Sequence, residues 1–334
     1  MKIKTQLKNI ASFSKGEQIK GDDLLENGLY DYLNGGICPS GKWDSYNTPA
    51  NTVTISEGGN SCGYVNFMKQ PFWCGAHCYY LFNTLSNTKY LYYVLKSQQD
   101  RLMKIRSGAC MPNIKKSDLG DFEIVYETDE LEQKRIVEIL SKCEKIIVSR
   151  KQQLQQLDEL VKARFVELFG DIQMPSKWDK KPWSDLVTIQ NGKDYKKIAV
   201  ETGGYPVYGT GGEMARASEY LCPENTVIVG RKGTINNPLL VEEKFWNVDT
   251  AFGVIVGNQL HYQYFYNFCK LFDFSTLNKQ AVLPSTTKAD LLKIEIAVPP
   301  IELQNEFANF VKEVDKSKFV EQKINDIFQF YLTV

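Results

Sequence analysis

The longest regular hydrophobic pattern lies between residues 130 and 169, a stretch without proline or glycine. Apolar residues recur there at alternating intervals of four and three, and Arg150 and Arg164 occupy two positions of the same register. This heptad spacing is typical of a helix that packs along another helix, and Gly170 supplies a stop signal. We therefore expect one long helix with a continuous apolar stripe. The stripe comprises Ile136, Leu140, Cys143, Ile147, Leu154, Leu157, Val161 and Leu168.

A second long helix is predicted from Glu302 towards residue 334, after Pro299 and Pro300. The polar stretch 316–323 interrupts its apolar pattern, so we expect the apolar seam to be broken there. Two such seams in one chain pair most economically with each other, although either helix alone also fits an amphipathic helix on a domain surface. The apolar positions are Leu303, Phe307, Phe310, Val311, Val314, Ile324, Ile327, Phe328 and Tyr331.

Outside these helices the sequence repeats itself. Residues of the first half recur in the second at an offset that shrinks from 176 to 172 and never grows. Short loop deletions produce such a drift, so we interpret the halves as a duplicated domain. Matching pairs include Gly16 and Gly192, Gly35 and Gly211, Asn51 and Asn225, Gly59 and Gly233, Trp73 and Trp246, Tyr90 and Tyr262, and Asp118 and Asp290.

Each repeat combines short strand-like runs with a helical stretch, which predicts a mixed α/β domain. Strands are expected at 51–55, 122–126, 225–229, 253–256 and 294–298, and helices at 89–106 and 260–272. The predicted organisation is a first domain at 1–128, a central helix at 129–170, a second domain at 171–300 and a C-terminal helix at 301–334.

The charge balance limits the kinds of partner. Lys plus Arg and Asp plus Glu number 40 each, so a uniformly basic nucleic-acid-binding surface is excluded, whereas a local basic cleft is not. Two histidines argue against His-centred catalysis or a His-rich metal site. No apolar run approaches the roughly 18 residues of a membrane span, and residues 1–7 lack an apolar signal core. We expect a cytoplasmic protein whose eight cysteines are reduced.

The starts of the two long helices carry a family motif. Glu130-Leu131-Glu132-Gln133 begins the first, and Pro299-Pro300 precedes Glu302-Leu303-Gln304 in the second. These segments resemble the conserved regions of type I restriction–modification specificity subunits, in which a Pro-Pro pair is followed by Glu-Gln-x-x-Ile. Segments 229–235 and 281–284 also resemble motifs of that family's target recognition domains.

The resemblance implies two target recognition domains that each read one half of a split DNA sequence. It implies long helices paired as an antiparallel coiled coil, two docked methylase subunits and, in some complexes, a restriction subunit. The chain itself would be non-catalytic and hold neither metal nor cofactor, with S-adenosylmethionine and ATP expected only on partner subunits.

Two loops in each repeat are predicted to contact double-stranded DNA. A Gly-bounded turn after a strand allows close approach to a phosphate, and Arg, Lys, Ser and Thr supply donors for bases and phosphates. Glu57 is expected to accept a hydrogen bond from a cytosine amino group; solvated turns are the alternative. The residues of the first repeat are Ser56, Glu57, Asn60, Arg106, Lys115 and Lys116. Those of the second are Arg231, Lys232, Thr234, Lys279, Gln280, Ser285, Thr286 and Lys288.

Enzyme alternatives have weaker support. The segment 209–212 resembles a cofactor loop but lacks the third glycine. A carboxylate nuclease core around Glu224, Glu242 and Glu243 has no counterpart in the first repeat. No methylase Asn-Pro-Pro-aromatic motif and no Walker A loop occurs. A degenerate or regulatory relative, and a methyltransferase in its own right, remain alternative functions. A zinc site would use Cys62, Cys74, His77 and Cys78, with buried thiols as the simpler interpretation.

Overall fold

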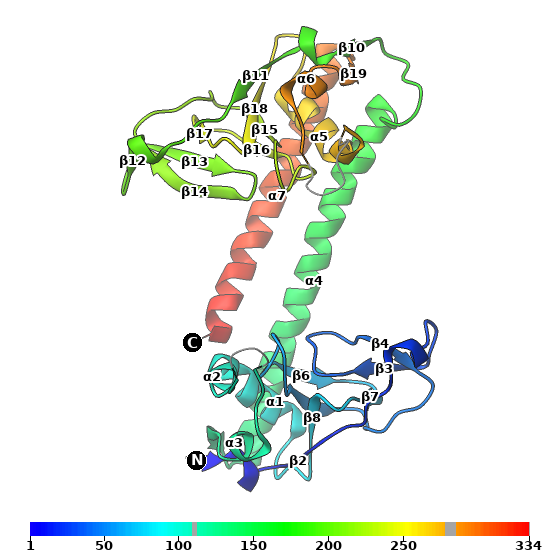
Figure 1. Ribbon diagram of the computed structural model, residues 1–334, viewed down its shortest axis with the longest axis vertical. Helices are drawn as coiled ribbons and strands as arrows, with labels where there is room; N and C mark the ends of the chain where they lie inside the picture. Colours follow the sequence, from blue (N-terminus) through cyan, green and yellow to red (C-terminus); the bar gives the residue numbers. More distant parts are fainter. Residues whose placement is uncertain (109–111, 278–284, 334) are drawn as a thin grey trace. The chain divides into compact units, whose positions relative to one another are not determined.

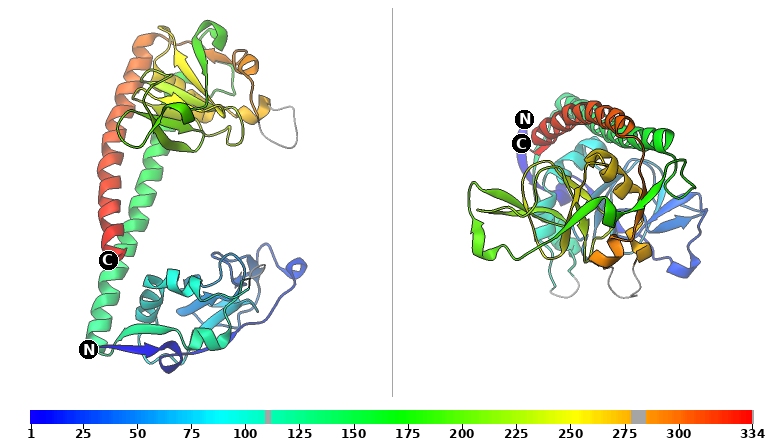
Figure 2. Two further views of the ribbon diagram at one scale, coloured as in Figure 1. Left: turned by 60° about the vertical axis from the view of Figure 1, so that its left-hand side comes forward. Right: turned by 90° about the horizontal axis from the view of Figure 1, so that it is seen from above.

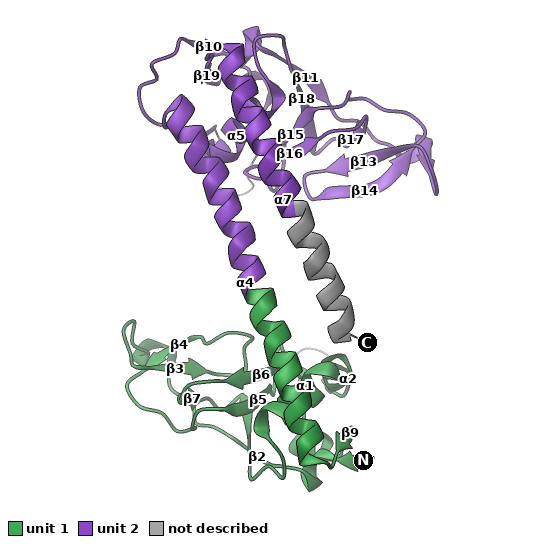
Figure 3. Ribbon diagram, turned by 180° about the vertical axis from the view of Figure 1, so that it is seen from behind, with its two compact units in different colours: residues 1–148, 327–334 green, residues 149–326 purple. Residues whose placement is uncertain are grey.

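The computed structural model describes residues 1–108, 112–277 and 285–333, with side chains described up to residue 318. The chain divides into two compact units, residues 1–148 with 327–334 and residues 149–326 (Figure 3). The division falls inside the helix α4 (Glu130–Phe169), which continues without interruption from one unit into the other. We describe each unit by itself.

Unit 1 is built on a four-stranded antiparallel sheet (Figure 1). Its strand order is β2 (Ser12–Lys15), β8 (Cys78–Phe82), β5 (Thr52–Ser56) and β6 (Val65–Met68). A three-stranded sheet has the order β4 (Gly41–Trp43), β3 (Tyr30–Leu33) and β7 (Phe72–Cys74), and β1 (Lys2–Gln6) pairs with β9 (Glu123–Glu127). The helices are α1 (Thr88–Ser97), α2 (Gln99–Lys104) and α3 (Lys116–Gly120), with short 3-10 turns η1 (Leu7–Asn9) and η2 (Gly21–Asp23).

Unit 2 has the same plan. Its main sheet has the order β11 (Val187–Asn191), β18 (Ala251–Val256), β15 (Thr226–Gly230) and β16 (Leu239–Val241). The second sheet has the order β12 (Ala199–Val200), β14 (Gly212–Ala217), β13 (Tyr205–Gly209) and β17 (Trp246–Asn247), and β10 (Lys180–Pro182) pairs with β19 (Glu295–Ala297). The helices are α5 (Tyr262–Leu271), α6 (Lys288–Leu291) and α7 (Ile301–Thr333), with 3-10 turns η3 (Trp183–Asp185), η4 (Lys196–Ile198) and η5 (Phe274–Leu277).

The matching strand orders confirm the predicted internal repeat and the mixed α/β class. The match extends to backbone detail. Asn51 and Asn225 both have φ of 57°, a left-handed conformation that asparagine tolerates better than most residues, immediately before the central strands β5 and β15. The predicted helix at 89–106 is wrong in one respect, because it is two helices, α1 and α2, that meet at Gln98.

The start of each long helix is tied to its domain by a buried glutamine. Gln133 Nε2 donates to the carbonyl of Glu127 at 2.7 Å, and Gln304 Nε2 donates to the carbonyl of Pro299 at 2.8 Å. Gln304 also accepts from the backbone N–H of His261 at 2.7 Å. These bonds give the family motif a physical role, because they link the first helical turn to the strand or loop before it.

In unit 2 the end of α4 packs antiparallel to the beginning of α7 (Figure 2). Phe165 and Phe307 have ring centroids 5.6 Å apart, while Asp158 pairs with Lys318 at 2.7 Å. The α7 helix is continuous through the polar stretch 316–323 and spans Ile301–Thr333, close to the expected range 301–334.

The buried face of α4 in unit 2 also corrects the predicted stripe. Val161, Phe165 and Phe169 are buried, and the domain's Tyr264 stacks on Phe165 at 5.4 Å. The predicted register position Arg164 lies at the edge, where it forms ion pairs with Glu167 and Glu306. Aromatic residues four apart cover the face because α4 must contact the domain as well as α7. Within the described residues, every helix is too short or too polar to cross a bilayer.

We expect Phe307→Ala to lower the free energy of unfolding of unit 2 by about 3–5 kcal/mol, since the fully buried ring contacts both Phe165 and Phe169. Phe310→Ala is the matched control, because Phe310 lies on the same helix but is only partly buried. Urea unfolding of both variants measures the difference. Equal losses would show that the Phe307 cluster does not join the helices to the domain.

Candidate nucleic-acid interface

The structure brings together the two predicted loops of each repeat. In unit 1 the turn after β5 meets the loop before α3, where Gly58 and Asn113 form an isolated antiparallel bridge. In unit 2 the turn after β15 meets the loop before α6, and Lys232 and Ser285 form the equivalent bridge. The two units therefore build the same loop pair.

In unit 2 the turn exposes three of the predicted side chains, Arg231, Lys232 and Thr234. The Arg231 guanidinium donates from Nη1 to the carbonyl of Asp249 at 3.2 Å and lies 5.9 Å from the centre of the Phe252 ring. This cation–π contact orients Arg231 while leaving it accessible.

The loop before α6 contributes less surface than predicted. Thr286 is buried, and its hydroxyl donates to the carbonyl of Gly230 at 2.7 Å. The exposed Lys288 donates to the carbonyl of Ile189 at 2.8 Å, and Ser285 is half-buried. The predicted residues Lys279 and Gln280 lie outside the described residues.

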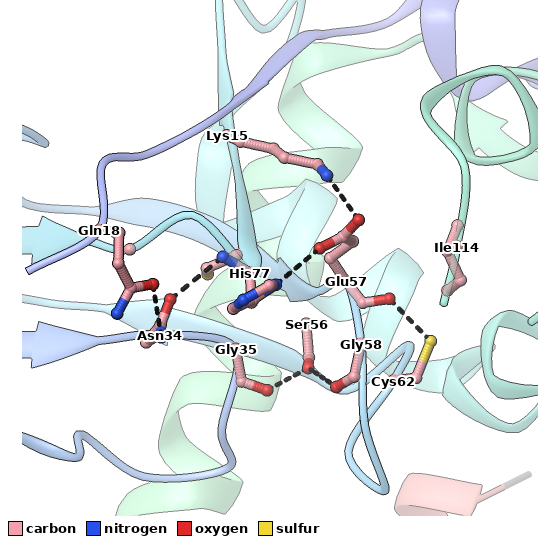
Figure 4. A network of polar contacts seen from close by, with 12 residues as sticks. Lys15, Gln18, Asn34, Gly35, Ser56, Glu57, Gly58, Cys62, His77 and Ile114 are labelled. Carbon is pink, nitrogen blue, oxygen red and sulfur yellow. Dashed lines mark hydrogen bonds and ion pairs between the residues drawn. The ribbon is translucent and has the colours of Figure 1, made fainter. Parts of the chain in front are cut away.

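In unit 1 the equivalent turn centres on Glu57 (Figure 4). One carboxylate oxygen forms an ion pair with Lys15 Nζ, and the other lies 3.2 Å from His77 Nδ1. Ser56 is buried, and its hydroxyl donates to the carbonyl of Gly35 and lies 3.2 Å from Ser61 Oγ. The remaining predicted residues of this unit are exposed: Asn60, Arg106, Lys115 and Lys116.

Burial therefore corrects two of the predicted contacts. Ser56 and Thr286 lie at the interior end of their loops, where each hydroxyl satisfies a backbone carbonyl. Neither side chain is available to a base. The strand pattern marked the right turn in each repeat but not which residues of the loops face inward.

The sequence analysis did not single out Lys15, and it named His77 only as an alternative zinc ligand. They come from β2 and from the turn before β8, far from Glu57 in sequence. Asn34 supports the cluster, because its side chain accepts from the backbone N–H of His77 at 3.1 Å and donates to Gln18 at 3.1 Å. One feature of the sequence could have drawn attention to Lys15, because it directly precedes Gly16, a glycine that recurs in the repeat.

In unit 1 a tyrosine that is neutral at ordinary pH, Tyr79, lies beside the loop pair. Burial, with a smaller effect of nearby Glu57, raises the pKa of Tyr79 to about 12. The Tyr79 hydroxyl donates to the carbonyl of Ile114 at 3.1 Å, which ties the second loop to the sheet. The ring is therefore an uncharged platform under the loops.

The enzyme and metal alternatives gain no support from the geometry. The segment 209–212 is the turn of the β13–β14 hairpin and is not followed by a helix. Cys62, Cys74 and Cys78 are buried thiols, and burial raises the pKa of Cys62, opposite to the shift that activates a thiol. In the part of the chain that the structure describes, no group of three or more His, Cys, Asp or Glu side chains is placed to hold a metal ion.

The sequence model of the family described as type I restriction modification DNA specificity domain matches residues 3–159 and again 175–329. The chain belongs to this family. The two matches, one in each repeat, agree with the duplication seen in the fold. Each of the two matched segments contains one of the loop pairs described above.

Relatives from other organisms extend this assignment. A putative type I specificity subunit of Mycoplasma genitalium is 31% identical over 228 residues, which cover 62% of this chain and 58% of that protein. A second, from Mycoplasma pneumoniae, is 30% identical over 222 residues, which cover 62% of this chain and 59% of that protein. The match therefore spans just under three fifths of these relatives' length.

A solved structure supports the fold. The crystal structure of the type I restriction–modification S subunit from M. genitalium has a TM-score of 0.72 and 23% identity, covering 99% of this chain and 94% of that chain. At this identity the likeness concerns the fold alone. The specificity-domain fold is thus seen over essentially the whole chain.

We expect Thr286→Val to destabilise unit 2 by about 1 kcal/mol, because the buried carbonyl of Gly230 loses its hydroxyl donor. Thr234→Val makes the same chemical change at an exposed position of the same turn, and there we expect less than about 0.5 kcal/mol. Thermal unfolding measures both. The assignment of Thr286 to the frame of the loop pair is contradicted if the two variants are equally stable.

Proposed function

We propose that the chain is the DNA-specificity subunit of a type I restriction–modification complex and reads a bipartite duplex sequence. The observation that carries the proposal is the loop pair present in both units with one backbone frame and different side chains. Glu57 in unit 1 and Arg231 in unit 2 occupy equivalent positions at an offset of 174. Two different half-sites require this combination of constant scaffold and variable surface.

The second loop pair is proposed to contact the major groove through Arg231 and Lys232. Arginine bonds bidentately to the O6 and N7 acceptors of guanine, whereas lysine acts mainly as a point charge on phosphate. Both side chains are exposed on a turn held by backbone bonds to Thr250 at 2.9 and 3.3 Å. A turn held by backbone bonds with two exposed cationic side chains fits base readout better than a flexible loop would.

The proposed ruler between the half-sites is α4. An uninterrupted helix of 40 residues is about 60 Å long at roughly 1.5 Å per residue. A domain of this size covers only a few base pairs, so reading a bipartite target needs a rigid spacer between the domains that read its two half-sites. The antiparallel packing of α4 and α7 in unit 2 supports this role.

Two methylase subunits are the proposed partners, with a restriction subunit in complexes that cut DNA. Each unit has a groove where the domain meets its long helix, of about 610 Å³ in unit 1 and about 620 Å³ in unit 2. The grooves are equivalent in the repeat, because Lys89 and Val137 line the first and His261 and Asn309, each 172 residues later, line the second. Equivalent grooves favour two copies of one partner.

Catalysis is proposed to belong to those partners, as is the binding of S-adenosylmethionine and ATP. The proposed location is the cytoplasm, where DNA and reduced thiols occur together. A degenerate or regulatory relative is the second candidate function, and co-purification with a methylase subunit separates the two.

We expect the homogeneous chain alone to transfer no methyl group to DNA and to bind no S-adenosylmethionine, because its loops hold DNA-contacting side chains and no catalytic motif. Radiolabelled methyl transfer and calorimetry test this expectation. The control is the same chain mixed with its methylase subunit, which should methylate the selected target. Measurable transfer by the chain alone would contradict the subunit assignment.

We expect Arg231→Gln with Lys232→Gln to change recognition of one half-site and leave the other unchanged. Each lost bidentate base contact should cost about 1–3 kcal/mol. Selection from randomised duplexes by the chain with its methylase subunits measures the preference at every position.

The matched control for this selection is Lys177→Gln with Lys293→Gln, which removes the same charge from exposed positions of unit 2. This control variant should keep the wild-type base preference at both half-sites. A uniform loss of affinity in the Arg231 and Lys232 variant would assign these residues to phosphate contacts, and an unchanged motif and affinity would remove the turn from the interface.

A further inference from the structure

The two units hold their recognition turns with the same backbone bonds. Glu57 N–H donates to the carbonyl of His77 at 2.9 Å, as Arg231 N–H donates to that of Thr250 at 2.9 Å. The carbonyl of Glu57 accepts from Ile114 at 2.9 Å, and that of Arg231 accepts from Thr286 at 3.0 Å. Residues 57 and 231 are therefore equivalent in space within their own units as well as in sequence.

An aromatic ring lies beside this turn in each unit. Tyr79 in β8 pairs with Ile55 of β5, and Phe252 in β18 pairs with Val229 of β15, in the same register. A cation lies over each ring. Lys15 Nζ is 5.5 Å from the centre of Tyr79, and the Arg231 guanidinium carbon is 5.9 Å from the centre of Phe252.

The two cations come from different strands. Lys15 is the last residue of β2 and pairs with Tyr79, whereas its equivalent in β11, Asn191, pairs with Phe252 and is uncharged. Arg231 belongs to the turn after β15, whose equivalent in unit 1 is the acidic Glu57. The charges at the two positions differ between the units, yet each ring keeps one cation over its face.

The geometry around Glu57 agrees with a supporting role. Its side chain is only 12% exposed, while those of its partners Lys15 and His77 are 43% and 62% exposed. Each carboxylate oxygen has one of these two groups beside it, so the carboxylate is oriented by side chains of its own unit. Glu57 is therefore the least exposed member of the cluster, and the side chains of Lys15 and His77 lie on either side of its carboxylate (Figure 4).

We propose that Lys15, which lies over Tyr79 as Arg231 lies over Phe252, contacts a DNA phosphate for unit 1, and that Glu57 is the positioning residue that holds Lys15 over Tyr79. The proposal rests on the proposed DNA-recognition function. It replaces the expectation that Glu57 itself accepts from a cytosine. A lysine held at one end by a carboxylate and below by a ring keeps its remaining N–H donors for a phosphate oxygen.

The test measures duplex binding by the full chain, with its methylase subunits, over a range of salt concentrations. Lys15→Asn copies the residue of unit 2 and should weaken binding uniformly over sequences, with the slope of log K against log salt about one unit shallower. Adding Glu57→Arg to Lys15→Asn rebuilds the arrangement of unit 2 and should restore the slope. This rescue would not follow from a merely structural role for the ion pair.

The single variant Glu57→Gln tests whether loss of the carboxylate strengthens or weakens duplex binding. It removes a negative charge near DNA, so a bystander carboxylate would strengthen binding when removed, whereas loss of a positioning residue weakens binding despite the more favourable charge. Glu123→Gln is the matched control, because it removes a carboxylate from an exposed ion pair with Lys4 in the same unit. Unfolding of each variant is followed in parallel.

The outcomes separate this inference from the proposed function. If Lys15→Asn binds duplex DNA as tightly as the wild type, with the same slope of log K against log salt, the inference is overturned and DNA recognition by the chain is unaffected. A change of base preference at one position in Glu57→Gln overturns it in favour of direct readout by the carboxylate. If the wild-type complex binds no duplex at all, both the inference and the proposed function fall.

Discussion

The attachment of each domain to its long helix depends on a buried glutamine. Gln133 and Gln304 lie in the first turn of α4 and α7, where the backbone N–H groups have no partner within the helix. Each side chain instead bonds to a carbonyl of the preceding strand or loop. A buried amide left without such partners would cost free energy, so the direction in which each helix leaves its domain is fixed by these bonds.

A small number of buried hydrogen bonds also holds the loop pair of each unit. Backbone bonds and two buried hydroxyls, those of Ser56 and Thr286, hold the loops, while the exposed residues of the turn make few contacts with the rest of the unit. The aromatic ring beneath the turn, tyrosine in one unit and phenylalanine in the other, gives a cation a defined place without an additional hydrogen bond. The same frame therefore carries a carboxylate in one repeat and a guanidinium in the other.

The repeat, the fold class and the existence of α4 followed from the sequence because they rest on local periodicity and on ordered matches between the halves. The inward position of Ser56 and Thr286 did not, since burial at the end of a strand depends on what packs above it. The aromatic face of α4 was missed because the heptad pattern describes contact with one helix, whereas Phe165 and Phe169 also contact α5. The grouping of Lys15 and His77 around Glu57 was not predicted, because a cluster assembled from three separated segments has no signature in any one of them.

The main-chain bonding of the turn at residues 57 and 231 has an evolutionary consequence. When peptide groups hold a loop, its backbone frame can carry an acidic side chain in one copy and a basic side chain in the other. Foldability and specificity are then under separate selection, and a duplicated gene can diverge in the sequence it recognises while both copies keep the same shape. Residues 57 and 231 carry opposite charges on the same backbone frame within one chain.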